Sequence, residues 1–188
     1  MKGFAKWTGI VLGGLIGVAV LAGVMLYPIG MEKLTRSYAG VQVEAVTIPT
    51  GADAVARGRD LVAARKCVKC HGEDLSGMLL ADDPFLGTLP ASNLTSGKGG
   101  IGGSYADVDW IRAIRHAIKP DGHAALFMND EFATMSDEDL GALIAYLKQL
   151  PPVDAEYPAM HVGPLTAIAP ALGLYTPVAE PFDQSAAR

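Results

Sequence analysis

The chain has 188 residues, of which 50% are hydrophobic, 19% charged and 7% aromatic. The length suits one domain with additional segments, and the apolar content excludes a disordered chain because half of the residues can be buried. The formal net charge of −5 argues against a protein that binds nucleic acid. Two cysteines cannot form a disulfide-dense scaffold, so their spacing matters more than their number.

An apolar segment occupies the N-terminus. No Asp, Glu, Lys or Arg lies between Lys6 and Glu32, and residues 7–27 are almost wholly apolar. A helix of that length spans about 30 Å of hydrocarbon at about 1.5 Å per residue. Trp7 and Tyr27 stand at its two ends, where amphipathic rings favour the membrane–water interface.

These features predict a single uncleaved transmembrane helix over residues 1–30. A cleaved signal peptide is the alternative, because Lys2 and Lys6 form a positive region before the apolar run. The run is longer than the apolar core of a usual signal peptide, and no clear A-x-A cleavage site follows it. We therefore favour the anchor.

Glycines recur every four residues within this segment, at Gly9, Gly13 and Gly17. They line one face of a helix and form two overlapping G-x-x-x-G motifs, which allow a second transmembrane helix to approach closely. Glycine is also common in transmembrane helices without a partner. A partner helix at this face is therefore one of two interpretations.

The rest of the chain divides into three parts. Residues 31–50 carry scattered charges and are interpreted as a tether, and residues 51–150 form a domain of ~100 residues, near the commonest domain size. Residues 151–188 are rich in proline, which excludes a regular helix or central strand throughout. We expect this tail to be extended.

The domain contains three predicted helices, over about 53–66, 105–118 and 137–150. Ser104 and Ser136 each precede an acidic residue by three positions, which is an N-terminal capping signature. The long segment between the first two helices shows neither helical nor strand periodicity, so we expect an all-α fold. Three helices cannot bury their apolar faces around such a loop, and a large apolar cofactor is the natural filler.

Cys67, Cys70 and His71 form the sequence Cys-Val-Lys-Cys-His, which fits the C-x-x-C-H pattern of covalent haem attachment. Two thiols separated by two residues can each add to one vinyl group of the same porphyrin. The adjacent imidazole is thereby carried under the ring, where a nitrogen can bind iron. We therefore predict one haem c, with both cysteines as thioethers.

Two other uses of a C-x-x-C pair fit less well. A thioredoxin-type redox pair belongs in a strand-rich βαβ context, which this chain lacks. A zinc site needs four ligands, and no second cysteine pair is present to complete it. A buried, neutral His71 would leave the cysteines unexplained.

A sixth iron ligand is expected from far downstream, across the ring. The methionine and histidine candidates are Met78, Met128, Met135, Met160, His116, His123 and His161. Met78 follows His71 too closely to reach the opposite face. Met128 lies in the loop between the second and third helices and is free to reach inward, so it is our first choice. Met135, directly before the third helix, is the alternative, although it could equally be the apolar contact at the start of that helix.

The histidines are weaker candidates. His116 falls on the side of its helix that carries Arg112 and Lys119, so we expect it to be exposed to solvent. His123 follows Asp121-Gly122 in a turn and has the character of an ordinary polar loop residue.

The order of helix, CVKCH, long loops, late methionine and final amphipathic helix resembles a class I monohaem cytochrome c. Three further stretches resemble the cytochrome c subunits of membrane-bound bacterial dehydrogenases: NLT at 93–95, WIRAIR at 110–115 and MSDEDL at 135–140. The resemblance covers roughly residues 56–153. It implies a small cytochrome c fold around one covalent haem. It also favours this reading of NLT over a glycosylation sequon, which the same letters fit.

The family resemblance also implies roles for particular residues. The methionine before the last helix, usually followed by proline, binds the iron in that family; Met128 occupies this place, and Asn129 stands where proline is usual. The first and last helices cross at a small residue, for which Gly58 against Tyr146 would match.

His/Met ligation leaves no open iron site, so one-electron transfer is the expected function, and the protein itself is not expected to be an enzyme. Redox proteins would be its donor and acceptor. Covalent haem attachment outside the cytoplasm, as the resemblance implies, places Met1 inside and the haem domain on the periplasmic side of a bacterial inner membrane.

Two rival functions remain open at this level. The departure at Asn129 leaves room for a haem enzyme or gas sensor with an open sixth coordination site. The glycine face and the proline-rich tail fit an assembly subunit of a larger membrane complex.

Overall fold

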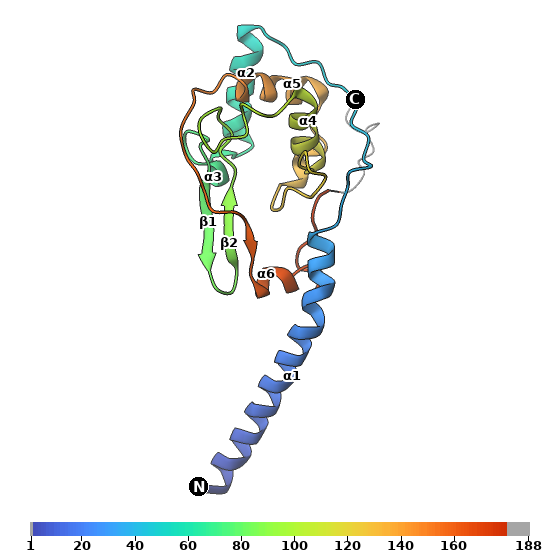
Figure 1. The fold of residues 1–188 in the computed structure, drawn as a ribbon, viewed down its shortest axis with the longest axis vertical. Coiled ribbons are helices and arrows are strands. Elements are labelled where there is room, and N and C mark those ends of the chain that lie inside the picture. Colours follow the sequence, from blue (N-terminus) through green and yellow to red (C-terminus); the bar gives the residue numbers. More distant parts are fainter. Residues whose placement is uncertain (1, 180–188) are drawn as a thin grey trace.

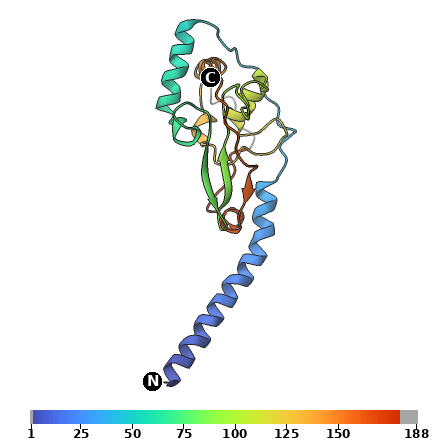
Figure 2. The same ribbon diagram turned by 60° about the vertical axis from the view of Figure 1, so that its left-hand side comes forward.

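The computed structural model describes residues 2–179 (Figure 1). Its elements in chain order are α1 (Lys2–Leu34), α2 (Ala52–Ala64), α3 (Val68–His71), β1 (Met78–Asp83), β2 (Gly87–Ala91), α4 (Asp107–His116), the 3-10 helix η1 (Asp130–Phe132), α5 (Asp137–Leu147), β3 (His161–Val162) and α6 (Pro164–Ile168). A long single helix leads into a small domain made of short helices and one hairpin (Figure 2).

The crossing of α2 and α5 is the main helix contact of the domain. Gly58 of α2 lies directly against α5: a Cβ added there would overlap the carbonyl oxygen of Ala142 and lie 2.7 Å from the Cβ of Tyr146. Only a residue without a side chain allows the two backbones to approach this closely. The predicted contact between Gly58 and Tyr146 is therefore present in the structure.

The hydrophobic core lies between α5, α4 and the segments that follow α3 and β2. Its fully buried members include Trp110 of α4 and Leu140 and Ile144 of α5. The side chain of Ser136 caps α5 by accepting a hydrogen bond of 3.2 Å from the N–H of Asp139, as its capping signature predicted.

The expectation of a strictly all-α fold is wrong, because the chain forms a small antiparallel sheet in the order β1-β2-β3. Asp83 sets the hairpin turn by accepting hydrogen bonds from the N–H groups of Phe85 and Leu86. In the described residues, β3 pairs with Gly87 and Thr88 of β2. Pro90 of β2 has no N–H to donate, but it lies opposite the irregularity in β1 and outside the part of β2 that pairs with β3. A proline is tolerated at such a position.

Helix α4 differs from its predicted bounds at both ends. It begins at Asp107, after Ala106, and Ser104 does not cap it; instead the carboxylate of Asp109 accepts from the N–H of Ala106 at 3.0 Å. It ends at His116, because Ala117 adopts the left-handed conformation with φ +52°. Ile118, the last expected helical residue, is instead fully buried beyond the helix end.

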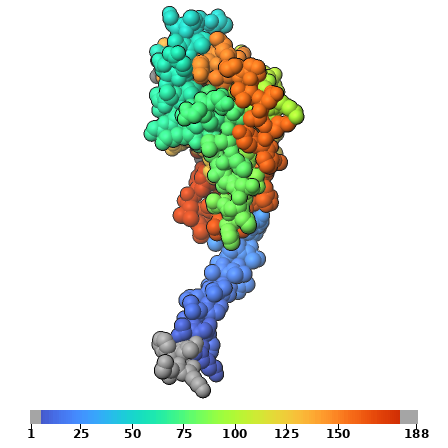
Figure 3. Space-filling model, turned by 90° about the vertical axis from the view of Figure 1, so that its left-hand side faces the viewer, coloured from blue at the N-terminus to red at the C-terminus, as the bar shows by residue number. Residues whose placement is uncertain are grey.

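The two segments expected to be a tether and an extended tail both pack on the domain. Val43, Val46 and Ile48 lie against the hydrophobic core. The tail runs over the surface next to the hairpin, as the orange and red atoms of Figure 3 show. It adds β3 to the sheet and then forms α6, which packs against α1.

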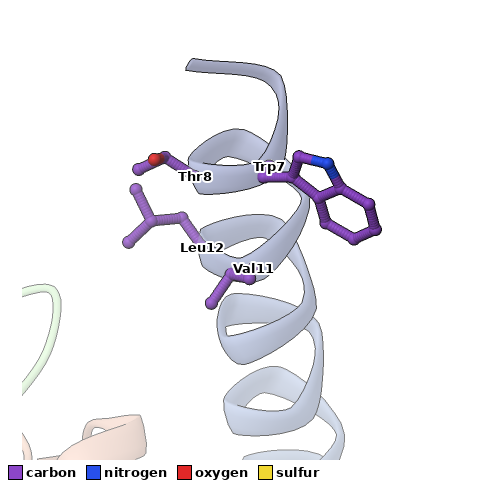
Figure 4. A pocket seen from close by; sticks show the side chains of 4 residues that line it. All are labelled: Trp7, Thr8, Val11 and Leu12. Carbon is purple, nitrogen blue, oxygen red and sulfur yellow. The ribbon is translucent and has the colours of Figure 1, made fainter. Parts of the chain in front are cut away.

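Residues Lys6–Leu34 form a helix that is long and apolar enough to cross a membrane. The helix continues through Pro28, beyond the predicted end of the anchor at residue 30. The N-terminal half of this helix is exposed. A shallow apolar hollow on its surface is lined by Trp7, Thr8, Val11 and Leu12 (Figure 4). A helix with apolar side chains all round is suited to a lipid environment.

Candidate haem-binding site

Cys67, Cys70 and His71 lie in a single helical turn. Lys66, with φ +58°, turns the chain out of α2, and Cys67 directly precedes the short helix α3 as its N-cap residue. The carbonyl of Cys67 accepts from the N–H groups of Cys70 at 3.2 Å and His71 at 2.9 Å. No disulfide joins the two cysteines, so both sulfurs are available for thioether bonds.

The imidazole of His71 is held by the backbone of the segment after β2. Its Nδ1 lies 2.8 Å from the carbonyl oxygen of Ser92. Burial lowers the pKa of His71, against the opposing effect of that carbonyl, so the ring is neutral near pH 7. A neutral ring with Nδ1–H on a carbonyl presents the lone pair of Nε2 as a metal ligand.

The thiol of Cys67 is also influenced by its surroundings. Burial raises the pKa of Cys67, which keeps the group protonated at neutral pH. It therefore lacks the exposed, electropositive setting of a reactive thiolate. This agrees with a thiol that serves as an attachment point instead of a redox centre.

The surface beside this turn is apolar. Three consecutive residues of β1, Met78, Leu79 and Leu80, are exposed, although a strand with one solvated face would alternate apolar and polar residues. The segment between α4 and α5 lies across from the hairpin in Figure 1 and exposes the ring of Phe127. Two cysteine sulfurs outside any disulfide, a neutral imidazole and exposed apolar side chains are a donor set and setting that fit haem c.

Met128 is half-buried in the segment between α4 and α5. Its neighbour Phe127 has φ +64°, donates its N–H to the hydroxyl of Tyr175 at 2.8 Å and packs its ring on that of Tyr175. Asn129 has φ −83° and ψ 134°, close to the conformation that proline imposes. Its side chain also caps η1 by accepting from the N–H of Glu131. Asparagine thus keeps the backbone shape that proline would give at this position.

Met135, the alternative ligand, is almost fully buried in the hydrophobic core beside α4 and α5. The other candidates outside α4 are exposed on the hairpin, on a turn or in the tail: Met78, Met160, His123 and His161. Among the candidate iron ligands, Met128 therefore differs from the others in lying in a loop with a side chain that is neither fully buried nor fully exposed.

The expectation that His116 is exposed is wrong: its side chain is 2% exposed, and among the described residues neither ring nitrogen has a hydrogen-bond partner. Arg115 is buried as well, which shows that the polar side of α4 is covered by other parts of the chain. The guanidinium of Arg115 donates to the carbonyl of Met135 at 2.9 Å and pairs with Asp137 at 2.8 Å, which draws the start of α5 against α4.

Asn93 and Thr95 have a structural role that sequence reasoning did not assign. Both are buried, and the amide of Asn93 donates to the carbonyl of Val153 at 2.8 Å while its oxygen accepts from the N–H and hydroxyl of Thr95. They fasten the tail to the strand end that carries Ser92. Burial of Asn93 also excludes glycosylation of the folded chain at this sequon.

Comparison with known proteins identifies the family of this chain. Residues 55–151 match the family model described as Cytochrome c, so the chain belongs to the cytochrome c family. Membership of this family implies a covalently bound haem c with its iron, which confirms the cofactor predicted from CVKCH.

Relatives of the chain include cytochrome subunits of dehydrogenases. The chain is 32% identical over 151 residues to the fructose dehydrogenase cytochrome subunit of Gluconobacter japonicus, covering 73% of this chain and 31% of the relative. It is 35% identical over 98 residues to the gluconate 2-dehydrogenase cytochrome c subunit of Pantoea cypripedii, covering 49% of this chain and 22% of the relative. The predicted resemblance is thereby confirmed, and the chain spans less than a third of the length of these relatives.

Proposed function

We propose that the protein is a membrane-anchored c-type cytochrome that carries single electrons through one His/Met-ligated haem, as a carrier or as the cytochrome subunit of a respiratory or dehydrogenase complex. The observation that carries this proposal is the turn from Cys67 to His71, with the imidazole held by the carbonyl of Ser92. In a cytochrome c family member, this turn would supply two thiols for attachment and one ligand for the iron of the same haem.

Each residue of the turn has a distinct role. Cys67 and Cys70 would each hold the haem through one thioether, formed by adding the S–H bond across a vinyl group. His71 would bind the iron through Nε2, while the hydrogen bond from Nδ1–H to the carbonyl of Ser92 fixes the plane of the imidazole and raises its basicity. The bound haem supplies the one-electron Fe(III)/Fe(II) couple. The apolar side chains of β1 exclude water from its face.

Met128 is proposed as the sixth ligand. Its loop position, its partial burial and the proline-like backbone of Asn129 support this assignment. With His71 and Met128 both bound, the iron would offer no coordination site to substrate or oxygen. The protein then transfers electrons without catalysing a reaction of its own.

The absorption spectrum of the oxidised protein tests this ligand. Met128→Ala should abolish the methionine–iron charge-transfer band, because alanine offers no sulfur to the iron, and Met135→Ala should keep it. A wild-type protein that lacks the band and binds carbon monoxide readily would instead be a haem enzyme or gas sensor with an open sixth site.

The anchor and the partners belong to the same proposal. A helix over Lys6–Leu34 would hold the haem domain on the periplasmic side of a bacterial inner membrane, where its redox donor and acceptor are met. An added Cβ at Gly9, Gly13 or Gly17 would meet nothing within 4 Å, so a second transmembrane helix could pack there. Native mass measurement after gentle detergent extraction should find the chain in a complex; a lone monomer would contradict this partner.

A further inference from the structure

Exposed apolar side chains gather at the end of the domain from which α1 leaves. The turn between β1 and β2 exposes Phe85 (64%), and the tail exposes Leu165 (55%) of α6 and, beyond it, Leu172 (54%) and Leu174 (76%). The tail around them is uncharged: no Asp, Glu, Lys or Arg lies between residues 156 and 180. Exposed apolar residues of this size in one region indicate an interaction surface.

The hairpin turn and α6 form one hydrogen-bonded unit. The N–H of Leu165 donates to the carbonyl of Phe85 at 3.0 Å, and the N–H of Gly163 donates to the carbonyl of Leu86 at 2.9 Å. The hydroxyl of Thr166 donates to the same carbonyl of Leu86 at 2.9 Å. The apolar side chains of both segments are therefore held in a fixed arrangement.

This unit lies beside the last turns of the apolar part of α1. A Cβ added at Gly30 would overlap the carbonyl oxygen of Ala167, and one added at Gly23 would lie 3.6 Å from Cδ1 of Ile168. The ammonium of Lys33 donates to the carbonyl of Pro170 at 2.9 Å. Figures 1 and 2 both place α6 next to this part of α1, with the hairpin turn beside α6. Tyr27, the expected interface residue, lies between the two glycines.

If α1 spans the membrane, as the proposed function requires, the unit sits at the level where the hydrocarbon gives way to the headgroups. We propose that the β1–β2 turn and α6 form a second membrane contact, in which Phe85, Leu165, Leu172 and Leu174 enter the interfacial layer of the lipid beside α1. This contact would fix the height and tilt of the haem domain above the bilayer. Continuity with the lipid-exposed surface of α1 favours lipid over a protein partner.

The charges near the surface are compatible with this position. The carboxylate of Asp83 accepts from two N–H groups of the hairpin turn, and that of Asp82 accepts from the hydroxyl of Thr88. Lys33 follows the apolar span of α1, and its ammonium, held on the carbonyl of Pro170, would meet the headgroup region. No carboxylate in the described tail has to enter the hydrocarbon.

Spin labelling of the full-length holoprotein tests the contact. Phe85→Cys and Leu174→Cys, each carrying a nitroxide, are reconstituted in nanodiscs of phosphatidylethanolamine and phosphatidylglycerol. Cys67 and Cys70 are blocked as thioethers. Collisions with molecular oxygen, which concentrates in lipid, are compared with those of a neutral water-soluble nickel chelate. Arg59→Cys on exposed α2 is the aqueous control, and Leu21→Cys on α1 is the membrane control.

Labels at positions 85 and 174 should favour oxygen over the chelate, as at position 21, whereas position 59 should favour the chelate. Chelate-accessible labels at 85 and 174 with a lipid-exposed label at 21 would overturn this contact alone. Labels at 85 and 174 shielded from both agents would mean a protein cover and would also overturn it. A chelate-accessible label at 21 would contradict the anchor, and the contact would fail with it.

Discussion

At the scale of single residues, His116 is a buried titratable group without a described partner. Burial, with the positive charges of Arg115 and Arg112, lowers the pKa of His116 below its ordinary value of about 6.5. The unfolded chain therefore takes up a proton below about pH 6.5 while the folded chain does not. The contribution of His116 to the free energy of unfolding is therefore fully present above about pH 6.5. It is lost as the pH falls from there to the pKa of His116 in the folded state.

We predict that His116→Gln flattens the pH dependence of stability in this range. One proton bound only by the unfolded chain gives a slope of up to about 1.4 kcal/mol per pH unit, and glutamine does not titrate. Denaturant unfolding of the holoprotein between pH 5 and 8 measures the slope. Equal slopes in wild type and His116→Gln would contradict the prediction.

At the scale of elements, the α2–α5 crossing depends on one missing side chain. Gly58→Ala places a methyl group against the carbonyl of Ala142 and 2.7 Å from the Cβ of Tyr146, so the helices must move apart. We predict a loss of about 1–3 kcal/mol in the free energy of unfolding, as for other overpacked cores. Denaturant unfolding measures it. Gly103→Ala, whose Cβ would meet its nearest neighbour at an ordinary 3.6 Å, should change little. Similar losses in both variants would contradict this account.

The same elements show which features a sequence can predict. The helices around Gly58, Trp110 and Leu140 follow from apolar periodicity, and the Ser136 cap from a local pattern. The hairpin was missed because Met78 to Leu80 do not alternate in polarity and Pro90 argues against a strand. An apolar run such as Met78 to Leu80 is expected in a strand that faces a cofactor, and the alternating pattern used to recognise strands does not allow for a cofactor.

The candidate site divides in the same way. The Cys67–His71 turn can be predicted because it is a local pattern of five consecutive residues. The family match confirms the cofactor predicted from it. Ser92 as the partner of His71, and Arg115 as the link between α4 and α5, depend on contacts between distant parts of the chain. The burial of His116 likewise depends on tertiary packing, which helical position alone cannot supply.

At the scale of the whole molecule, the haem domain is joined to α1 by more than a chain connection. Three contacts bring α6 against α1: Gly30 against Ala167, Gly23 against Ile168 and Lys33 on the carbonyl of Pro170. Segments at opposite ends of the described chain thereby meet where the domain leaves the apolar helix (Figure 1). The orientation of the domain relative to α1 is thus set by packing between the helix and the tail.

We predict that Gly30→Ala opens this joint while Gly23→Ala does not. The added methyl group at position 30 overlaps the backbone of Ala167, which cannot rotate away as a side chain can, so α6 must separate from α1. At position 23 the same methyl group meets Cδ1 of Ile168 at 3.6 Å, an ordinary contact. Hydrogen exchange of the holoprotein in nanodiscs should therefore quicken at the amides of residues 167–174 in Gly30→Ala only, with the amides of α2 unchanged in both variants. Equal exchange in the two variants would mean that this close approach does not hold the domain to the helix.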